Sequence, residues 1–354
     1  MMQWRVTARK VAPIVAVKRP FLLPAIGAVC ALLVPGVASQ PQSGRDMLLV
    51  VNKGDRTLSV FDPGSGRQLG VVPLDGKTGH EVAVSPDGST AWVPIYGDSA
   101  VGKSGSDGRS LSVIDLKMLR KIATVSLPWP ARPHAAVFSP RDGRLYVTAE
   151  LMSAILAIDP VTRKVTATIP TKQPESHMLA ISGDGKRAYT ANVSAGTVSA
   201  IDLDRQEVLA VVPVSASVQR IAISRDDRWV FTADQATPQV AVIDTTRNVV
   251  ARRLPLPALG YGLATTEDGR RLLVTIPSLH SIVVLDLRSS VIERSIQVPP
   301  EPQEVLLRDN RVAYVSCAES KEVAEIDISS GKITKLLTTG AGADGLAWVR
   351  AAHH

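Results

Sequence analysis

The strongest constraint on the fold is a short pattern, an apolar residue followed by Asp, that recurs along most of the chain. The Asp residues of this pattern are Asp62, Asp115, Asp159, Asp202, Asp244, Asp286 and Asp327, at intervals of 53, 44, 43, 42, 42 and 41 residues. One copy, residues 177–212, contains four runs rich in β-branched and small apolar residues, and its turns contain Gly, Asp or Asn. Four strands in a repeat of about 42 residues are typical of a propeller blade.

A second repeated feature, the turn between the first and second strands, indicates how the circle closes. This turn occurs six times, one copy fewer than the Asp pattern, at 85–88, 139–143, 182–185, 225–227, 267–269 and 308–310. The first blade therefore begins at Met47 with its second strand, and residues 345–349 fit the missing first strand. We expect an all-β, seven-bladed β-propeller with four strands per blade, in which the C-terminal strand closes blade one.

Several short motifs resemble the repeat of YVTN-type β-propellers. They are Ser-Pro-Asp-Gly at 85–88, Tyr-Val-Thr at 146–148, Tyr-Thr-Ala-Asn at 189–192 and the recurring Ile-Asp. The resemblance covers roughly residues 45–350 and implies the propeller fold. It does not imply one activity, because such propellers include binding proteins, electron-transfer partners and hydrolases, and a fold does not determine a function.

The N-terminal segment has the composition of an export signal. Residues 1–20 contain five basic and no acidic residues, and residues 21–39 form a mostly apolar run that ends in small residues. We expect residues 1–39 to be a signal peptide, followed by a propeller over 40–350 and a tail at 351–354. The mature protein would be periplasmic or secreted and free of the membrane. An uncleaved anchor is the alternative, and Pro24 and Pro35 favour cleavage.

The charge of the chain changes once this leader is removed. The whole chain has 40 basic and 33 acidic residues, and five of the basic ones lie in the leader, which leaves 35 against 33. This near balance gives no support for a nucleic-acid partner. Cys30 also lies in the leader, so the mature chain keeps only Cys317 and has no internal disulfide.

The long interval between Asp62 and Asp115 marks an insertion in blade two. Residues 96–110 are rich in Gly, Ser and Asp and lie between the second and third strands of the repeat. A surface insertion of this composition is well tolerated in a propeller. The alternative is a flap over one mouth of the central channel.

Polar residues occupy the position that opens the innermost strand of each blade, at one mouth of the channel. They are Asp344, His80, His134, His177, Gln219, Tyr261 and Gln303. The loop after the second strand opens on the same mouth and begins with polar residues in blades three to five, namely Glu150, Asn192 and Asp234. Pairing within each blade would place His134 with Glu150, His177 with Asn192 and Gln219 with Asp234. Four charged residues lie beside the ring: Glu81, Arg132, Arg220 and Glu304.

This ring predicts a ligand site, and its composition leaves the chemistry open. Half of the six histidines of the mature chain occupy it. The ring could instead cap loop backbone groups and bind water. In the simplest functional interpretation, it recognises a polar small molecule or a protein partner and no reaction takes place.

A divalent metal is a second interpretation of the same residues. His80, His134 and His177 come from neighbouring blades, and Glu81 or Glu150 could join them. Zinc and copper accept such nitrogen and oxygen ligands. Because no two of these histidines are close in sequence, this interpretation depends on the closure of the propeller.

A hydrolase is the third interpretation. Arg132-Pro133-His134, with Glu150 farther along, resembles a motif of lactonase-type propellers, although the order departs from the Pro-Arg-His of that family. The resemblance implies that His134, Glu150 and Arg132 act on a ring ester or related acid, with the role of Arg132 in doubt. The alternative is a His–Glu hydrogen bond that only orders the mouth. We expect an exported propeller that binds a small ligand, metal ion or protein partner, and leave open whether it is an enzyme.

Overall fold

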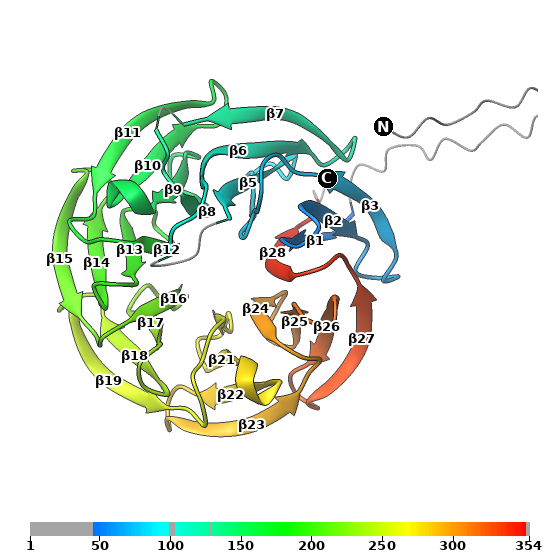
Figure 1. Cartoon of the computed structure of the whole chain (residues 1–354). Helices are drawn as coiled ribbons and strands as arrows, with labels where there is room; N and C mark the ends of the chain where they lie inside the picture. The colour runs from blue at the N-terminus through cyan, green and yellow to red at the C-terminus, as the bar shows by residue number, and fades with distance from the viewer. Residues whose placement is uncertain (1–44, 99–102, 128, 352–354) are drawn as a thin grey trace, which may run out of the picture. The chain divides into compact units, whose positions relative to one another are not determined.

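The computed structural model describes residues 45–98, 103–127 and 129–351, and within them the chain forms seven four-stranded antiparallel sheets around one axis (Figure 1). The predicted all-β, seven-bladed propeller is confirmed. Two short 3-10 helices, η1 (Glu150–Met152) and η2 (Pro277–Leu279), interrupt loops after second strands. The predicted signal peptide at 1–39 and residues 352–354 of the tail lie outside the described residues.

The strands follow the same order from the axis outward in every blade. The innermost strands are β28 (Ala343–Val349), β4 (Ala83–Val84), β8 (Pro133–Phe138), β12 (Ser176–Ile181), β16 (Val218–Ile223), β20 (Leu263–Thr265) and β24 (Pro302–Leu307). The second strands are β1 (Met47–Asn52), β5 (Thr90–Gly97), β9 (Leu145–Ala149), β13 (Arg187–Asn192), β17 (Trp229–Asp234), β21 (Arg271–Ile276) and β25 (Val312–Cys317). The third strands are β2 (Thr57–Phe61), β6 (Asp107–Asp115), β10 (Ala154–Asp159), β14 (Thr197–Asp202), β18 (Gln239–Asp244), β22 (Ser281–Asp286) and β26 (Glu322–Asp327). The outer strands are β3 (Gln68–Pro73), β7 (Arg120–Ser126), β11 (Lys164–Pro170), β15 (Glu207–Pro213), β19 (Val249–Pro255), β23 (Val291–Gln297) and β27 (Lys332–Thr338).

The core lies between the stacked blades. Second and third strands such as β9 and β10 are buried almost throughout, because their two faces meet neighbouring blades. The outer strand β11 alternates exposed and partly buried residues, as expected at a rim that faces water on one side. Val, Ile, Leu and Ala supply most of the buried side chains, which agrees with the low aromatic content of the chain.

The recurring Asp that identifies the repeat caps the turn between the third and fourth strands. In blade four, Oδ1 of Asp202 accepts hydrogen bonds from the backbone amides of Asp204 and Arg205, each at 2.9 Å. The same contacts occur at Asp159 and Asp244. The carboxylate satisfies two amides that the tight turn leaves unpaired, so the pattern has a structural cause.

The C-terminal strand completes blade one, as predicted. β28 pairs antiparallel with β1, with Met47 opposite Val349 and Leu49 opposite Ala347. The backbone amide of Lys53 also donates to the carbonyl of Gly342 at 3.0 Å. Joining the two ends of the repeat leaves no unpaired inner strand in this blade.

The insertion in blade two is more regular than its composition indicates. Residues 96–110 were expected to form one enlarged loop. β5 continues to Gly97 and β6 begins at Asp107, and these two residues pair, so the expected bounds were too wide; residues 99–102 lie outside the described residues. A Gly- and Ser-rich sequence can continue a hairpin when the flanking strands fix its register. Within the described residues, no helix is both long and apolar enough to span a membrane.

Candidate functional site

A β-bulge at the start of the inner strands turns consecutive side chains toward the channel. In β16, Val218 pairs with Asp234 and Ile221 pairs with Thr232, so Gln219 and Arg220 together oppose one residue of β17. β8 and β24 have the same irregularity. A bulge breaks the strict alternation of a strand, which explains how a ring residue and its successor can both reach the axis.

The structure brings six of the seven predicted ring residues into one chain of contacts around the mouth. Nδ1 of His80 lies 3.0 Å from Oδ2 of Asp344. The ring centroids of His80 and His134 are 5.0 Å apart, and those of His134 and His177 are 3.6 Å apart. Nε2 of Gln219 then lies 3.2 Å from Nε2 of His177 and 3.3 Å from the hydroxyl of Tyr261.

Gln303, the seventh ring residue, is buried and is held through its backbone. Its carbonyl accepts a hydrogen bond of 2.8 Å from the hydroxyl of Thr275 in the preceding blade. The structure therefore places Gln303 in the ring. Among the described residues, however, no side-chain contact joins it to the other six ring residues.

Burial keeps two of the three imidazoles neutral. His134 is 2% exposed, and its burial, with the nearby His177 and His80, holds its pKa well below the usual range. Burial also lowers the pKa of His177, although the hydrogen bond that its imidazole donates to Glu150 opposes this effect. Neutral imidazoles offer one nitrogen lone pair each, which can accept a proton or bind a cation.

His134 is also distinguished by an unsatisfied polar atom. Its Nδ1 is buried and has no hydrogen-bond partner among the described residues. Leaving such an atom unpaired costs about 1–3 kcal/mol. A site that retains this atom at the channel mouth is suited to a partner from outside the chain.

Glu150, at the first position of η1, connects three blades. Its Oε1 contacts Nδ1 of His177 at hydrogen-bond distance, and its Oε2 accepts a hydrogen bond of 2.9 Å from the hydroxyl of Tyr96. Arg132 lies 3.7 Å from the same Oε2 and donates to Asp107 at 2.8 Å. Burial and the charge of Glu150 raise the pKa of Tyr96, so its hydroxyl stays protonated.

These contacts correct the predicted pairs. Glu150 was expected to pair with His134 of its own blade, but it pairs with His177 of the next blade. The pair is formed across blades because neighbouring blades pack closely at the axis. Tyr96 and Asp107 were not predicted as site residues, because both lie in the insertion that was expected to be a loop. That insertion does reach the blade-three sector, as these two residues show.

Asn192 and Asp234, both predicted to bind ligand, have their polar atoms engaged within the blades. Asn192 accepts from Ser176 at 2.8 Å and donates to Ser199 at 3.0 Å. Asp234 accepts from Gln239 at 2.8 Å and from loop backbone amides. The expected pairs with His177 and Gln219 were therefore wrong, because these buried groups satisfy the loop that follows each second strand.

Arg220 occupies the channel on the other side of the mouth. Its Nη1 lies 2.6 Å from Oε1 of Glu81 and 2.8 Å from Oε2 of Glu304, and its Nη2 lies 3.4 Å from Oδ1 of Asp344. The guanidinium carbon is 4.4 Å from the ring centroid of Tyr261. Arg220 is 2% exposed, so this cation is buried among the carboxyl groups and the ring of Tyr261.

The pKa values of the three carboxyl groups around Arg220 shift in different directions, since burial raises that of Glu304 as well as that of Glu81, whereas that of Asp344 is lowered. Burial raises the pKa of Glu81 to about 8, and the nearby Glu304 and Asp344 add to this effect against the charge of Arg220. Burial would also raise the pKa of Asp344, but the hydrogen bond to His80 and the charges of Lys53 and Arg220 lower it below its usual value. Lys53, whose Nζ is 3.3 Å from Asp344, was not predicted.

The arrangement does not form a metal centre as it stands. Within the described ranges, no three His, Cys, Asp or Glu side chains are placed so that they could hold a metal ion together. The rings of His134 and His177 are in contact and tilted by 34° to each other, and this contact does not form a shared set of metal ligands. His80 and His177 nevertheless each direct Nδ1 at a carboxylate, the arrangement that orients metal-ligating imidazoles in proteins.

A small apolar cavity adjoins the ring at Tyr261. It has a volume of about 460 Å³ and lies between the loops of blades five and six, where Pro238, Leu259 and Pro277 line it. A ligand held at the mouth would find both polar groups and an apolar wall within reach of Tyr261. Such a combination is common in sites for small molecules.

Comparison of the sequence with protein-family models and with curated proteins finds no match. Solved structures do match. The chain is similar to hydrazine synthase of Kuenenia stuttgartiensis (TM-score 0.68, 20% identity, 86% of this chain and 99% of that chain). It is also similar to a functionally unknown protein from Desulfotomaculum acetoxidans (0.71, 17%, 86% and 99%). A third is dihydro-heme d1 dehydrogenase NirN in complex with DHE (0.63, 15%, 87% and 77%). Because the identities are so low, these structural similarities establish the propeller fold alone.

Proposed function

We propose that the protein binds a small polar ligand at the mouth of the channel, in the sector of His80, His134 and His177. The observation that supports this proposal most strongly is the buried, unpartnered Nδ1 of His134. A ring with only a structural role would satisfy this atom from the chain, as the chain does for Nδ1 of His80 and His177. A ligand atom beside His134 would remove the cost of the unpaired nitrogen.

The charges around the ring favour a ligand that carries positive charge. Five carboxyl groups, those of Glu81, Asp107, Glu150, Glu304 and Asp344, face three fixed cations, those of Lys53, Arg132 and Arg220. Burial raises the pKa values of both Glu81 and Glu304, which reduces this excess. A cation, a small organic amine or a basic side chain of a partner protein has the complementary charge.

A zinc or copper ion is the metal form of this proposal. It would bind at Nε2 of His80 and His177, whose Nδ1 atoms are held by Asp344 and Glu150. Binding requires His134 to turn away from its contact with His177 and Gln219 to release Nε2 of His177, so that three nitrogens converge. The buried and satisfied Asn192 and Asp234 have no part in this site.

Native mass spectrometry of the untagged full chain, purified from its source cells without chelator, tests the proposal. We expect a mass above that of the denatured chain, and we expect His134→Phe to lose it, because Phe fills the same space without a nitrogen. His280→Asn is the matched control: His280 is exposed, lies outside the ring and has a left-handed backbone that Asn tolerates. A wild-type chain without added mass, or a His134→Phe chain that retains it, contradicts the proposal.

A hydrolase is the second candidate function, and the pair His177–Glu150 favours it. Glu150 is positioned to hold Nδ1–H of His177, so Nε2 is the acceptor that a general base needs. Nε2 lies 3.2 Å from the side-chain amide of Gln219, which has to give way to a substrate. Arg132 lies beside Glu150 and can stabilise negative charge near the pair. This assignment gives His177 the role that the lactonase resemblance gave to His134. Hydrolysis of a lactone panel by the wild type, lost in His177→Gln and retained in His280→Asn, is the expected result; no hydrolysis by the wild type excludes this candidate for those substrates.

We also propose that the protein is exported and acts in the periplasm or outside the cell. The basic and apolar composition of residues 1–39 supports this location. The motifs at 85–88 and 189–192 likewise support placing the repeats among YVTN-type propellers. N-terminal sequencing of the protein from its source cells should show a chain that begins near residue 40. A chain that still begins at Met1 contradicts export by cleavage.

A further inference from the structure

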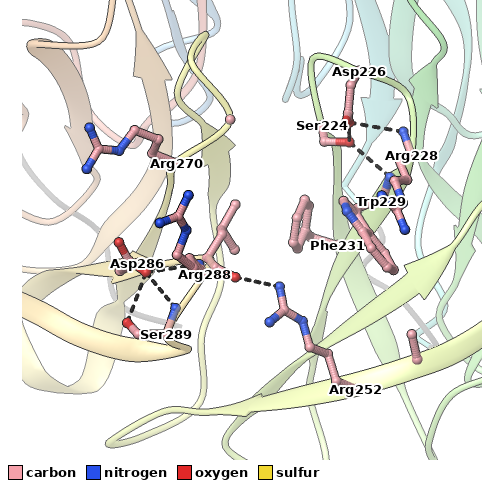
Figure 2. Close-up of a pocket in the computed structure, with 13 residues that line it drawn as sticks. Ser224, Asp226, Arg228, Trp229, Phe231, Arg252, Arg270, Asp286, Arg288 and Ser289 are labelled. Atoms are coloured by element: carbon pink, nitrogen blue, oxygen red, sulfur yellow. Dashed lines mark hydrogen bonds between the residues drawn. The ribbon is translucent and has the colours of Figure 1, made fainter.

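A second cavity lies at the other end of the blades, away from the ring. It has a volume of about 1210 Å³ and is formed between blades five and six by turns that follow β16, β20 and β22 (Figure 2). Ring residues open the inner strands, so the turns after those strands lie at the opposite end of each blade. We call this cavity the arginine groove.

Four arginines line the arginine groove, and two Asp residues are the acids among its lining residues. Arg228 and Arg252 come from blade five, and Arg270 and Arg288 come from blade six, so the two pairs face each other across the groove (Figure 2). The charge of the mature chain is nearly balanced, with 35 basic and 33 acidic residues. The positive excess in this groove is therefore a local feature.

The acids at the rim are engaged in their own turns. Oδ1 of Asp226 accepts hydrogen bonds from Ser224 at 2.6 Å and from the backbone amide of Arg228 at 3.2 Å. Oδ1 of Asp286 accepts from the backbone amides of Arg288 and Ser289. The acids thus hold the backbone that carries two of the arginines.

Three of the four guanidinium groups remain available. Arg228, Arg270 and Arg288 are exposed, and within the described part of the chain none of them forms an ion pair with a carboxylate. Asp286 and Asp268 are near enough to Arg270 for its charge to lower their pKa values. Arg228 lies over the ring of Trp229, with 5.0 Å from its guanidinium carbon to the ring centroid, and this contact limits its freedom.

Arg252 is already fixed across the groove. It donates to the carbonyl of Leu287 at 2.7 Å and to the hydroxyl of Ser290 at 2.9 Å, and so joins blade five to blade six. Neutral acceptors satisfy these donors without cancelling the charge of Arg252. The groove thus has one rigid cation at its base and three exposed cations around it.

We propose that the arginine groove binds a small polyanion that carries at least two phosphate or carboxylate groups. Guanidinium groups bind both kinds of oxyanion with paired hydrogen bonds. Several arginines in one groove can therefore recognise the geometry of an oxyanion as well as its charge. Four cations against two engaged carboxylates leave an excess of two positive charges. A cavity of about 1210 Å³ accommodates a ligand of this size.

Isothermal titration calorimetry with pyrophosphate and with citrate tests the proposal on the full chain. We expect at least one of the two anions to bind, more weakly at high ionic strength, and their relative affinities distinguish phosphate from carboxylate recognition. The variant Arg270→Gln/Arg288→Gln removes one side of the groove and should raise the dissociation constant by about tenfold or more. Arg252 is left unchanged because it joins the two blades.

A charge-matched control separates the groove from general attraction. Arg205 and Arg311 are exposed arginines outside the groove, and Arg205→Gln/Arg311→Gln removes the same charge. We expect this control to change the dissociation constant by about twofold or less. The proposal is overturned if neither anion binds at concentrations up to about 5 mM, because a dissociation constant above that value is too weak for a specific site. Equal weakening in the control and in the groove variant would overturn it as well.

Discussion

At the scale of single residues, His134 differs from its two neighbours in the ring. Nδ1 of His80 and His177 is held by a carboxylate, whereas Nδ1 of His134 is buried and unpaired. The same burial lowers the pKa of His134 well below 6.5. Protonation of this imidazole is therefore far easier in the unfolded chain than in the folded one.

The stability of the protein should consequently fall in mildly acidic solution. A histidine whose pKa is lower in the folded state contributes no penalty above pH 6.5, and its penalty grows as the pH falls below that value, because the unfolded chain takes up the proton. We expect the urea midpoint of the wild type to decrease from pH 7.5 to pH 5. The decrease should be smaller in His134→Phe. Some decrease should remain in that variant, because the pKa of His177 is also lowered by burial. An equal decrease in the wild type and in His134→Phe would show that His134 does not cause the acid sensitivity.

Arg220 is the residue on which the other half of the mouth depends. Replacement by Met leaves Glu81, Glu304 and Asp344 close together in a buried site with no central cation. We expect Arg220→Met to lower the free energy of unfolding by about 3–5 kcal/mol at neutral pH. Adding Glu81→Gln and Glu304→Gln should restore part of the loss. An Arg220→Met protein as stable as the wild type would show that the cluster is not coupled in this way.

At the scale of elements, the bulged start of inner strands such as β8, β16 and β24 determines which side chains reach the axis. The close approach of neighbouring blades at this point leaves little space for a side chain at two of the successor positions. A Cβ atom at Gly345 would lie 2.4 Å from the carbonyl oxygen of His80, and one at Gly262 would lie 2.3 Å from that of Gln303. In other blades the same position holds Glu81, Arg220 and Glu304, which fill the channel.

Gly345→Ala tests this close packing at the blade that joins the two ends of the chain. The added methyl group must displace backbone, so we expect a loss of about 1–3 kcal/mol in the free energy of unfolding. Gly64→Ala is a suitable control, because its Cβ would meet only the side chain of Asp62 at 3.3 Å. Urea unfolding of both variants gives the comparison. Equal stability of the two would contradict the contact between β28 and blade two.

At the scale of the whole molecule, the circular repeat could be predicted from sequence and the contacts between blades could not. The seven copies of the Asp pattern predicted seven blades, and the six copies of the first turn predicted closure by β28. Both patterns are local features that repeat along the chain. The pair His177–Glu150 depends on how adjacent blades pack, and no spacing in the chain encodes that. Tyr96 and Asp107 were missed because pairing across the insertion extends β5 and β6 beyond the repeat pattern.

Closure has a functional consequence, because it brings together groups from opposite ends of the chain. Asp344 contacts His80, Lys53 and Arg220, which come from blades two, one and five. The two ends of the blades then differ in charge, with excess carboxyl groups around the ring at one end and excess guanidinium groups in the arginine groove at the other. The two proposed ligands would therefore carry opposite charges.

A crystal structure of the protein purified without affinity tag or chelator is the most direct test of a ligand at the ring. We expect electron density for a group that is neither protein nor water, within hydrogen-bond or coordination distance of a ring nitrogen of His134. Density for water alone at that nitrogen, or a protein acceptor or donor bonded to it, would contradict a ligand at the ring.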